Sequence, residues 1–131
     1  SRSFKLNLNL GKFDVFERPH FSSVPLEAVF FSSFVFSLNP ITPYTLINRI
    51  LKFKPKLVIH YEPLYELNQG SNSFEKRVRT YIDYNDYNRN LLGALEVFQQ
   101  SGHIKILNVS KNVFGLNPEF PASIIMWEPR C

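Results

Sequence analysis

A helix-to-strand step in the middle of the chain constrains the fold more than any other feature of the sequence. The turn Asn39-Pro40-Ile41-Thr42-Pro43 predicts a helix start, because its threonine can accept an orphan backbone N–H and its second proline suits the first helical position. The apolar residues that follow recur at helical spacing: Leu46, Ile47, Ile50 and Leu51. Pro55 ends this helix, and the apolar run Leu57-Val58-Ile59 then predicts a buried strand.

The residues before this step predict two further strands. Lys5–Leu10 alternates polar and apolar side chains, which is typical of a half-buried strand. Residues 13–25 show no sustained period and contain two prolines, so we expect mostly loop. Leu26–Phe36 is dense in β-branched and aromatic residues, and this predicts a strand that is buried on both faces.

The residues after the step predict two helices and two strands. A helix is expected from about Ser73, with Phe74, Val78 and Ile82 turned inward. A longer helix follows, ended by a left-handed cap at Gly102. Its apolar stripe is predicted to comprise Tyr84, Tyr87, Leu91, Leu95 and Phe98. Strands are expected at 104–109 and 123–127, and no helix separates them, so they should form an antiparallel hairpin.

This order of elements predicts an α/β fold with a mostly parallel sheet and flanking helices. No repeat or low-complexity tract interrupts the 131 residues, so a single domain over residues 1–131 is expected.

Composition excludes several classes of protein. No apolar run approaches the roughly 18 residues of a membrane span, and no apolar core follows Ser1-Arg2-Ser3, so neither a membrane helix nor a signal peptide is expected. Cys131 is the one cysteine, which excludes an internal disulfide and fits a cytoplasmic location. The three histidines, His20, His60 and His103, lack metal-ligand spacing, so no metal site is predicted.

Charge and aromatic content leave two kinds of partner open. The net charge is +4, and two basic clusters contribute to it, Lys52-Lys54-Lys56 and Lys76-Arg77-Arg79. Such clusters either attract phosphate-bearing partners or form a solvated rim. The chain also has 13 phenylalanines, most of which must lie in a core or an interface.

Three stretches resemble the second half of class I S-adenosylmethionine-dependent methyltransferases. Leu26–Val35 is similar to the fourth strand of that family, in which an acidic residue precedes an apolar run that ends in small polar residues. Ile50–Ile59, followed by Glu62-Pro63, resembles the fifth strand and its lead-in, and Ala122–Pro129 resembles the closing strand. Residues 81–91 and 112–118 also look like an uncharacterised branch of the family. The resemblance implies a Rossmann-like sheet whose reversed last strand pairs with its predecessor.

The chain departs from the family pattern at the cofactor loop. The family carries a glycine-rich turn after its first strand, whereas the five glycines here, at positions 11, 70, 93, 102 and 115, are widely spaced. The chain is therefore expected to be the C-terminal part of a longer methyltransferase that continues upstream, supplying the acceptor side of the site.

The resemblance implies a site at the carboxyl ends of the parallel strands, where ligands bind in α/β sheets. His60 and Glu62 lie two residues apart just past a strand and are candidates for a catalytic acid–base pair. The alternative is an edge histidine with a solvated glutamate. The residues expected to bind S-adenosylmethionine are Lys12, Asp14, Ser32 and Ser33. The residues expected to bind the unknown acceptor are Ser37, Tyr61, Asp83, Tyr84, Asn85 and Asn88.

Asp83, Tyr84, Asn85 and Asn88 are placed at the start of the longer helix, where free N–H groups can bind a ligand or be capped locally. Two other functions remain open. The chain could be an α/β interaction module, associating as a homo-oligomer through a Phe-rich surface, or a nucleic-acid-contacting protein that uses its basic clusters.

Overall fold

The computed structural model describes residues 24–38, 42–113 and 121–130. The described part is an α/β fold with a four-stranded mixed sheet. Its elements in chain order are β1 (Val29–Ser33), α1 (Pro43–Lys52), β2 (Leu57–Glu62), the short 3-10 helix η2 (Tyr65–Leu67), α2 (Ser73–Tyr84), α3 (Leu91–Gln100), β3 (Ile104–Ser110) and β4 (Ser123–Pro129). The strand predicted at Lys5–Leu10 and the cofactor candidates Lys12 and Asp14 lie outside the described residues.

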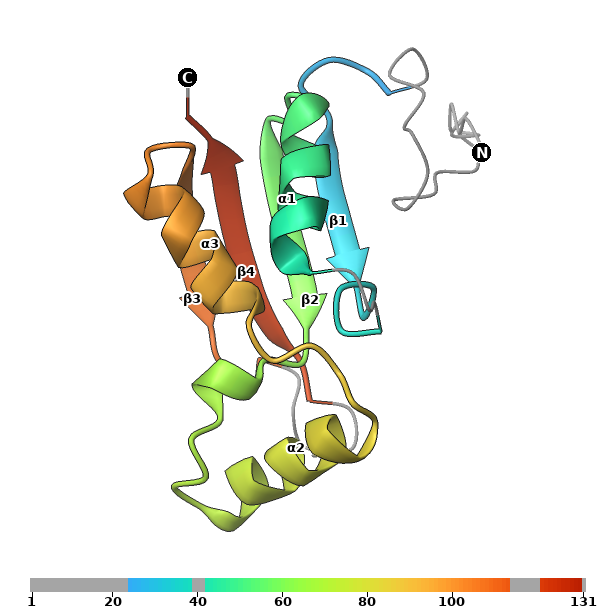
Figure 1. Cartoon of the computed structure of the whole chain (residues 1–131), viewed down its shortest axis with the longest axis vertical. Coiled ribbons are helices and arrows are strands. Elements are labelled where there is room, and N and C mark those ends of the chain that lie inside the picture. Colours follow the sequence, from blue (N-terminus) through green and yellow to red (C-terminus); the bar gives the residue numbers. More distant parts are fainter. Residues whose placement is uncertain (1–23, 39–41, 114–120, 131) are drawn as a thin grey trace, which may run out of the picture.

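The strand order in the sheet is β1-β2-β4-β3 (Figure 1). β1 and β2 are parallel, with Ser32 opposite His60. β4 is antiparallel to both of its neighbours, so β3 and β4 form the predicted hairpin. Its register with β3 shifts between Ile106 and Asn108, which marks a bulge.

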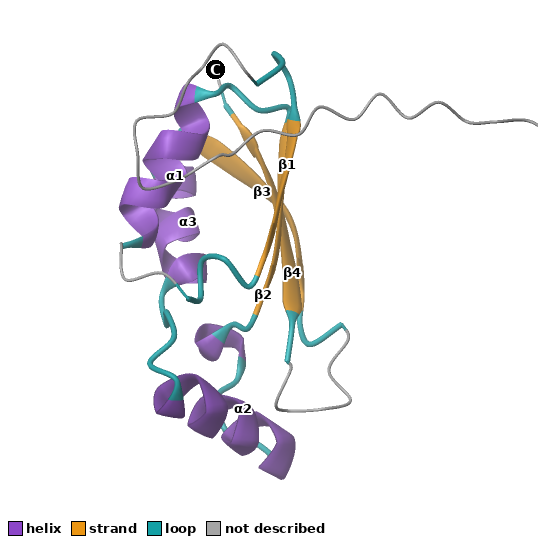
Figure 2. Ribbon diagram, turned by 90° about the vertical axis from the view of Figure 1, so that its right-hand side faces the viewer, coloured by secondary structure: helices purple, strands orange, loops and turns teal. Residues whose placement is uncertain are grey.

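Helices α1 and α3 cover one face of the sheet (Figure 2). The core lies between them and the sheet, around the fully buried Trp127 of β4. α1 buries Leu46, Ile47 and Ile50 as its periodicity predicts, and Pro43 occupies its first turn. Helix α2 lies apart, beyond the carboxyl ends of β1 and β2, in both views (Figures 1 and 2).

Two predictions about the elements are wrong. β1 is shorter than Leu26–Phe36, and it is not buried on both faces, because Val29 and Phe31 are 56% and 66% exposed. The long helix does not begin before Tyr84: α2 ends at that residue and α3 begins at Leu91. The linker contains Asp86 in a left-handed conformation, with φ of 52°, which breaks the helix between them.

The two edges of the described sheet differ. At β3, the bulge and the exposed Lys105 blunt the edge, and the N–H of Ile106 donates to Oε1 of Gln99 at 2.7 Å. β1 has neither a bulge nor a charged residue, and among the described strands it pairs with β2 alone. Together with its exposed Phe31, β1 therefore offers an open and apolar edge.

Candidate functional site

A chain of hydrogen bonds links Trp127, His60, Ser32 and Glu62 across three adjacent strands. The indole Nε1–H of Trp127 donates to Nε2 of His60 at 2.9 Å, and Nδ1 of His60 lies 2.6 Å from Oγ of Ser32. Since an indole nitrogen can only donate, Nε2 must carry the lone pair, and the ring proton sits on Nδ1. His60 therefore donates to Ser32, whose hydroxyl donates in turn to Oε1 of Glu62 at 3.2 Å.

His60 is neutral in this arrangement. Its side chain is fully buried, and desolvation by burial lowers its pKa from 6.5 to about 3. The edge of its ring packs against Phe36, with ring centroids 4.6 Å apart. With both nitrogens engaged and no exposed surface, the imidazole is held in one tautomer and cannot reach a ligand in solvent.

Glu62 binds the loop that follows β1. Its carboxylate is 1% exposed. Oε1 accepts from the N–H groups of Val35 and Phe36 at 2.9 and 3.0 Å, and Oε2 accepts from N–H and Oγ of Ser37 at 3.4 and 3.1 Å. Burial raises the pKa of Glu62 above its ordinary value, and these hydrogen bonds act in the opposite direction. The carboxylate thus sets the path of the loop at the carboxyl end of β1.

The predicted acid–base pair is therefore placed together, but neither member faces solvent. The carboxylate does not contact the imidazole directly, because the Ser32 hydroxyl lies between them. The alternative of a solvated glutamate is also not what the structure contains, since Glu62 is buried. The geometry favours positioning roles for both residues over proton transfer to a substrate.

The other predicted residues fall into two groups. Ser33 is exposed at the end of β1, and Tyr61 is half-buried on β2 opposite it. Ser37 joins the Glu62 network, and its carbonyl accepts from the N–H of Asn88 at 3.1 Å, so these two predicted residues are brought together. Asp83, Tyr84 and Asn85 are exposed at the C-terminal end of α2, and the predicted helix start at these residues is therefore wrong.

A cavity lies beside the Ser32–His60 pair, next to β1. Its volume is about 240 Å³. The residues that line it are Phe30, Phe31, Ser32, Val35, Phe36, Ile50, Val58 and His60. Because this lining is apolar apart from one hydroxyl and one imidazole, the cavity suits an apolar group.

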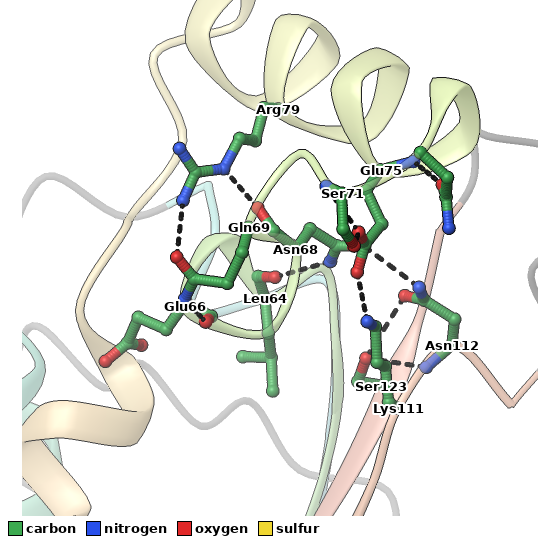
Figure 3. Close-up of polar contacts among 11 residues, drawn as sticks. Leu64, Glu66, Asn68, Gln69, Ser71, Glu75, Arg79, Lys111, Asn112 and Ser123 are labelled. Atoms are coloured by element: carbon green, nitrogen blue, oxygen red, sulfur yellow. Dashed lines mark hydrogen bonds and ion pairs between the residues drawn. The ribbon is translucent and has the colours of Figure 1, made fainter.

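A second buried polar cluster fastens α2 to the β3–β4 hairpin (Figure 3). Glu75 of α2 accepts from Ser71 and from the ammonium of Lys111, which follows β3. Hydrogen bonds from Lys111 and Ser71 lower the pKa of Glu75 to about 2. On the far side of the cluster, Nδ2 of Asn112 donates to Oδ1 of Asn68 at 2.9 Å.

Glu66 links η2 to the start of α3. Its carboxylate oxygens accept from the N–H groups of Leu92 and Gly93 at 2.8 and 2.6 Å, so it caps a helix that begins 25 positions further along the chain. A Cβ on Gly93 would lie 3.0 Å from Oε2 of Glu66. Sequence reasoning missed Trp127, Glu66 and Glu75; a glycine in the first turn of a helix was the one available signal.

Among the described residues, no group of three or more potential metal ligands comes together. No described helix is long and apolar enough to cross a membrane. No protein-family model, curated protein or solved structure matches the chain.

Proposed function

We propose that this chain is the acceptor-side half of an S-adenosylmethionine-dependent methyltransferase with a Rossmann-like sheet. The observation that carries the proposal is the sheet order: a parallel pair, β1 and β2, followed by a reversed last strand, β4, that pairs with its predecessor β3. This is the arrangement that the sequence resemblance implies.

The uncovered face of the sheet supports the same proposal. Parallel sheets are normally covered by helices on both faces. Here α1 and α3 lie on one face (Figure 2), while Val29 and Phe31 are exposed at the open edge. An upstream half of the enzyme would extend the sheet at β1 and cover these side chains.

The described residues fit one side of such a cofactor only. Ser33 has an exposed hydroxyl at the carboxyl end of β1, next to the loop that Glu62 fixes. The Ser32 hydroxyl is already engaged with His60 and Glu62, so it is not available to a ligand. The chain contains no glycine-rich turn for the methionine end, which would have to come from the upstream half.

The chemistry asks for little from these residues. S-adenosylmethionine supplies an electrophilic methyl group and a neutral leaving group, so positioning of the acceptor can provide much of the rate. This chain's contribution is a rigid loop after β1, held by Glu62, and an apolar cavity beside it.

A titration followed by amide NMR tests the proposal. S-adenosylhomocysteine at millimolar concentration should shift the amide signals of Ser33, Phe34 and Val35, even if the half-site binds weakly. The amides of Leu107 and Val109, on the opposite edge of the sheet, serve as the internal control. Shifts confined to the control edge, or no shift at saturating ligand, would contradict the proposal.

The open edge of β1 favours a second candidate function, a non-catalytic interaction module. An exposed apolar edge strand promotes association with another chain. Light scattering over a range of concentrations distinguishes this function, because self-association should give a mass above 15.3 kDa that falls on dilution. The variant Phe31→Lys should then remain monomeric, whereas Leu107→Lys should not change the mass.

A further inference from the structure

Helix α2 presents a stripe of cations and one aromatic ring to solvent. Its buried side is formed by Glu75, Val78 and Ile82. The exposed residues at helical spacing on the opposite side are Ser73, Lys76, Arg77, Thr80 and Tyr84. Their positions fall within an arc of about 100° around the helix axis, so they share one face.

The two cations of this stripe have no carboxylate partner in the described part of the chain. There, the ion pairs join Arg89 to Asp83 and Asp86, and Lys111 to Glu75. Arg89 therefore offsets the two carboxylates near the end of α2, and Lys76 and Arg77 keep their charge available to a ligand.

Tyr84 is unusual for an aromatic residue in its exposure. It is 89% exposed, and its phenol makes no hydrogen bond in the described structure. Because Tyr84 is eight positions after Lys76, the ring lies about 12 Å along the helix from the first cation. Cations that contact a backbone, followed by a ring on which a base can stack, are typical of surfaces that bind single-stranded nucleic acid.

The aromatic end of the stripe is the end near the candidate site. Asn88, four positions after Tyr84, donates its N–H to the carbonyl of Ser37 at 3.1 Å, in the loop held by Glu62. α2 itself lies beyond the carboxyl ends of β1 and β2 (Figure 1). A strand lying along α2 would therefore bring a base close to the crevice at these strand ends.

We infer that the acceptor is single-stranded nucleic acid, with phosphates on Lys76 and Arg77 and a base stacked on Tyr84. This inference rests on the proposed function for the word acceptor, but the binding surface itself does not require the cofactor. Glu75 and its contacts with Lys111 hold α2 in place beneath the stripe.

Fluorescence anisotropy with a labelled oligouridine tests the inference on this chain alone. Binding should weaken as salt rises, and Lys76→Ala with Arg77→Ala should lower the slope of log affinity against log salt by about 1.4, two phosphates at ~0.7 each. Tyr84→Ala should weaken binding about five- to a hundredfold without changing that slope, and Tyr84→Phe should retain the affinity.

A charge-matched control separates this surface from general attraction. Lys52→Ala with Lys56→Ala removes the same charge from exposed positions at the opposite end of the sheet, and it should leave affinity nearly unchanged. An equal loss in the control variant, equal competition by polyglutamate, or no binding at low salt would overturn the inference. Since no cofactor is present, the outcome is independent of the S-adenosylhomocysteine titration.

Discussion

The indole nitrogen of Trp127 donates to Nε2 of His60 at 2.9 Å, and this one bond fixes the direction of every proton in the network up to Glu62. Both residues are fully buried. The bond joins β4 to β2, so a polar contact holds the middle of the sheet together beneath α1 and α3.

Trp127→Phe should destabilise the fold by more than the lost ring area predicts. The change removes the donor and leaves Nε2 of His60 buried without a partner, which costs about 1–3 kcal/mol beyond the cavity term. Denaturant unfolding measures the loss, and NMR of the ring nitrogens reports the tautomer. Tyr84→Phe, at an exposed position, is the control and should leave the midpoint unchanged.

Stability should fall as His60 is forced to accept a proton. Its pKa is lowered by burial from 6.5 to about 3, so the unfolded chain binds this proton first as the pH decreases. The contribution is fully present above pH 6.5 and is lost between there and pH 3, at ~1.4 kcal/mol per pH unit. The slope of unfolding free energy against pH should decrease in His60→Gln and persist in His103→Gln, at an exposed position.

Parts of this arrangement could be predicted from sequence and parts could not. α1 was predictable because a proline start and a strong apolar period agree. The exposure of Phe31 was not, because an apolar run does not tell whether the described chain covers both of its faces. The false start of the long helix at Tyr84 arose because Tyr84, Tyr87 and Leu91 have helical spacing by coincidence, across a left-handed turn.

The role of Glu62 was hidden for a related reason. Its position after a strand could be read from the sequence, but its hydrogen-bond donors come from residues 25 to 30 positions upstream. Local spacing suggested His60 as its partner, whereas the fold inserts Ser32 between them. Long-range contacts of this kind decide whether a carboxylate is exposed or buried.

Glu62→Gln should loosen the loop after β1 while leaving the rest of the sheet intact. The side-chain amide keeps one acceptor oxygen and loses the other, so the amides of Val35 and Phe36, or that of Ser37, lose their partner at about 1–3 kcal/mol. Hydrogen exchange should accelerate at these residues, in contrast to the exposed control Glu96→Gln. Unchanged exchange would show that Glu62 does not set the loop.

Glu75 predicts a separate loss of stability at lower pH. Hydrogen bonds from Lys111 and Ser71 lower its pKa from 4.5 to about 2, so this contribution is complete above pH 4.5 and disappears as the pH falls towards 2. Glu75→Gln should remove this part of the pH dependence and detach α2, seen as faster amide exchange at Val78 and Ile82. Exchange in β2 should remain slow, because the Glu75 cluster does not contact that strand's pairing with β1.

Gly93→Ala should have an effect whose sign depends on Glu66. Alanine normally favours a helix over glycine by up to about 1 kcal/mol, but here its Cβ would lie 3.0 Å from the carboxylate that caps α3. In the native background the substitution should therefore gain less than that amount or destabilise the protein. In a Glu66→Ala background, which lacks the carboxylate, the same substitution should recover the full helix preference. Unfolding free energies of the four proteins form a double-mutant cycle, and a coupling near zero would contradict the close approach of these two residues.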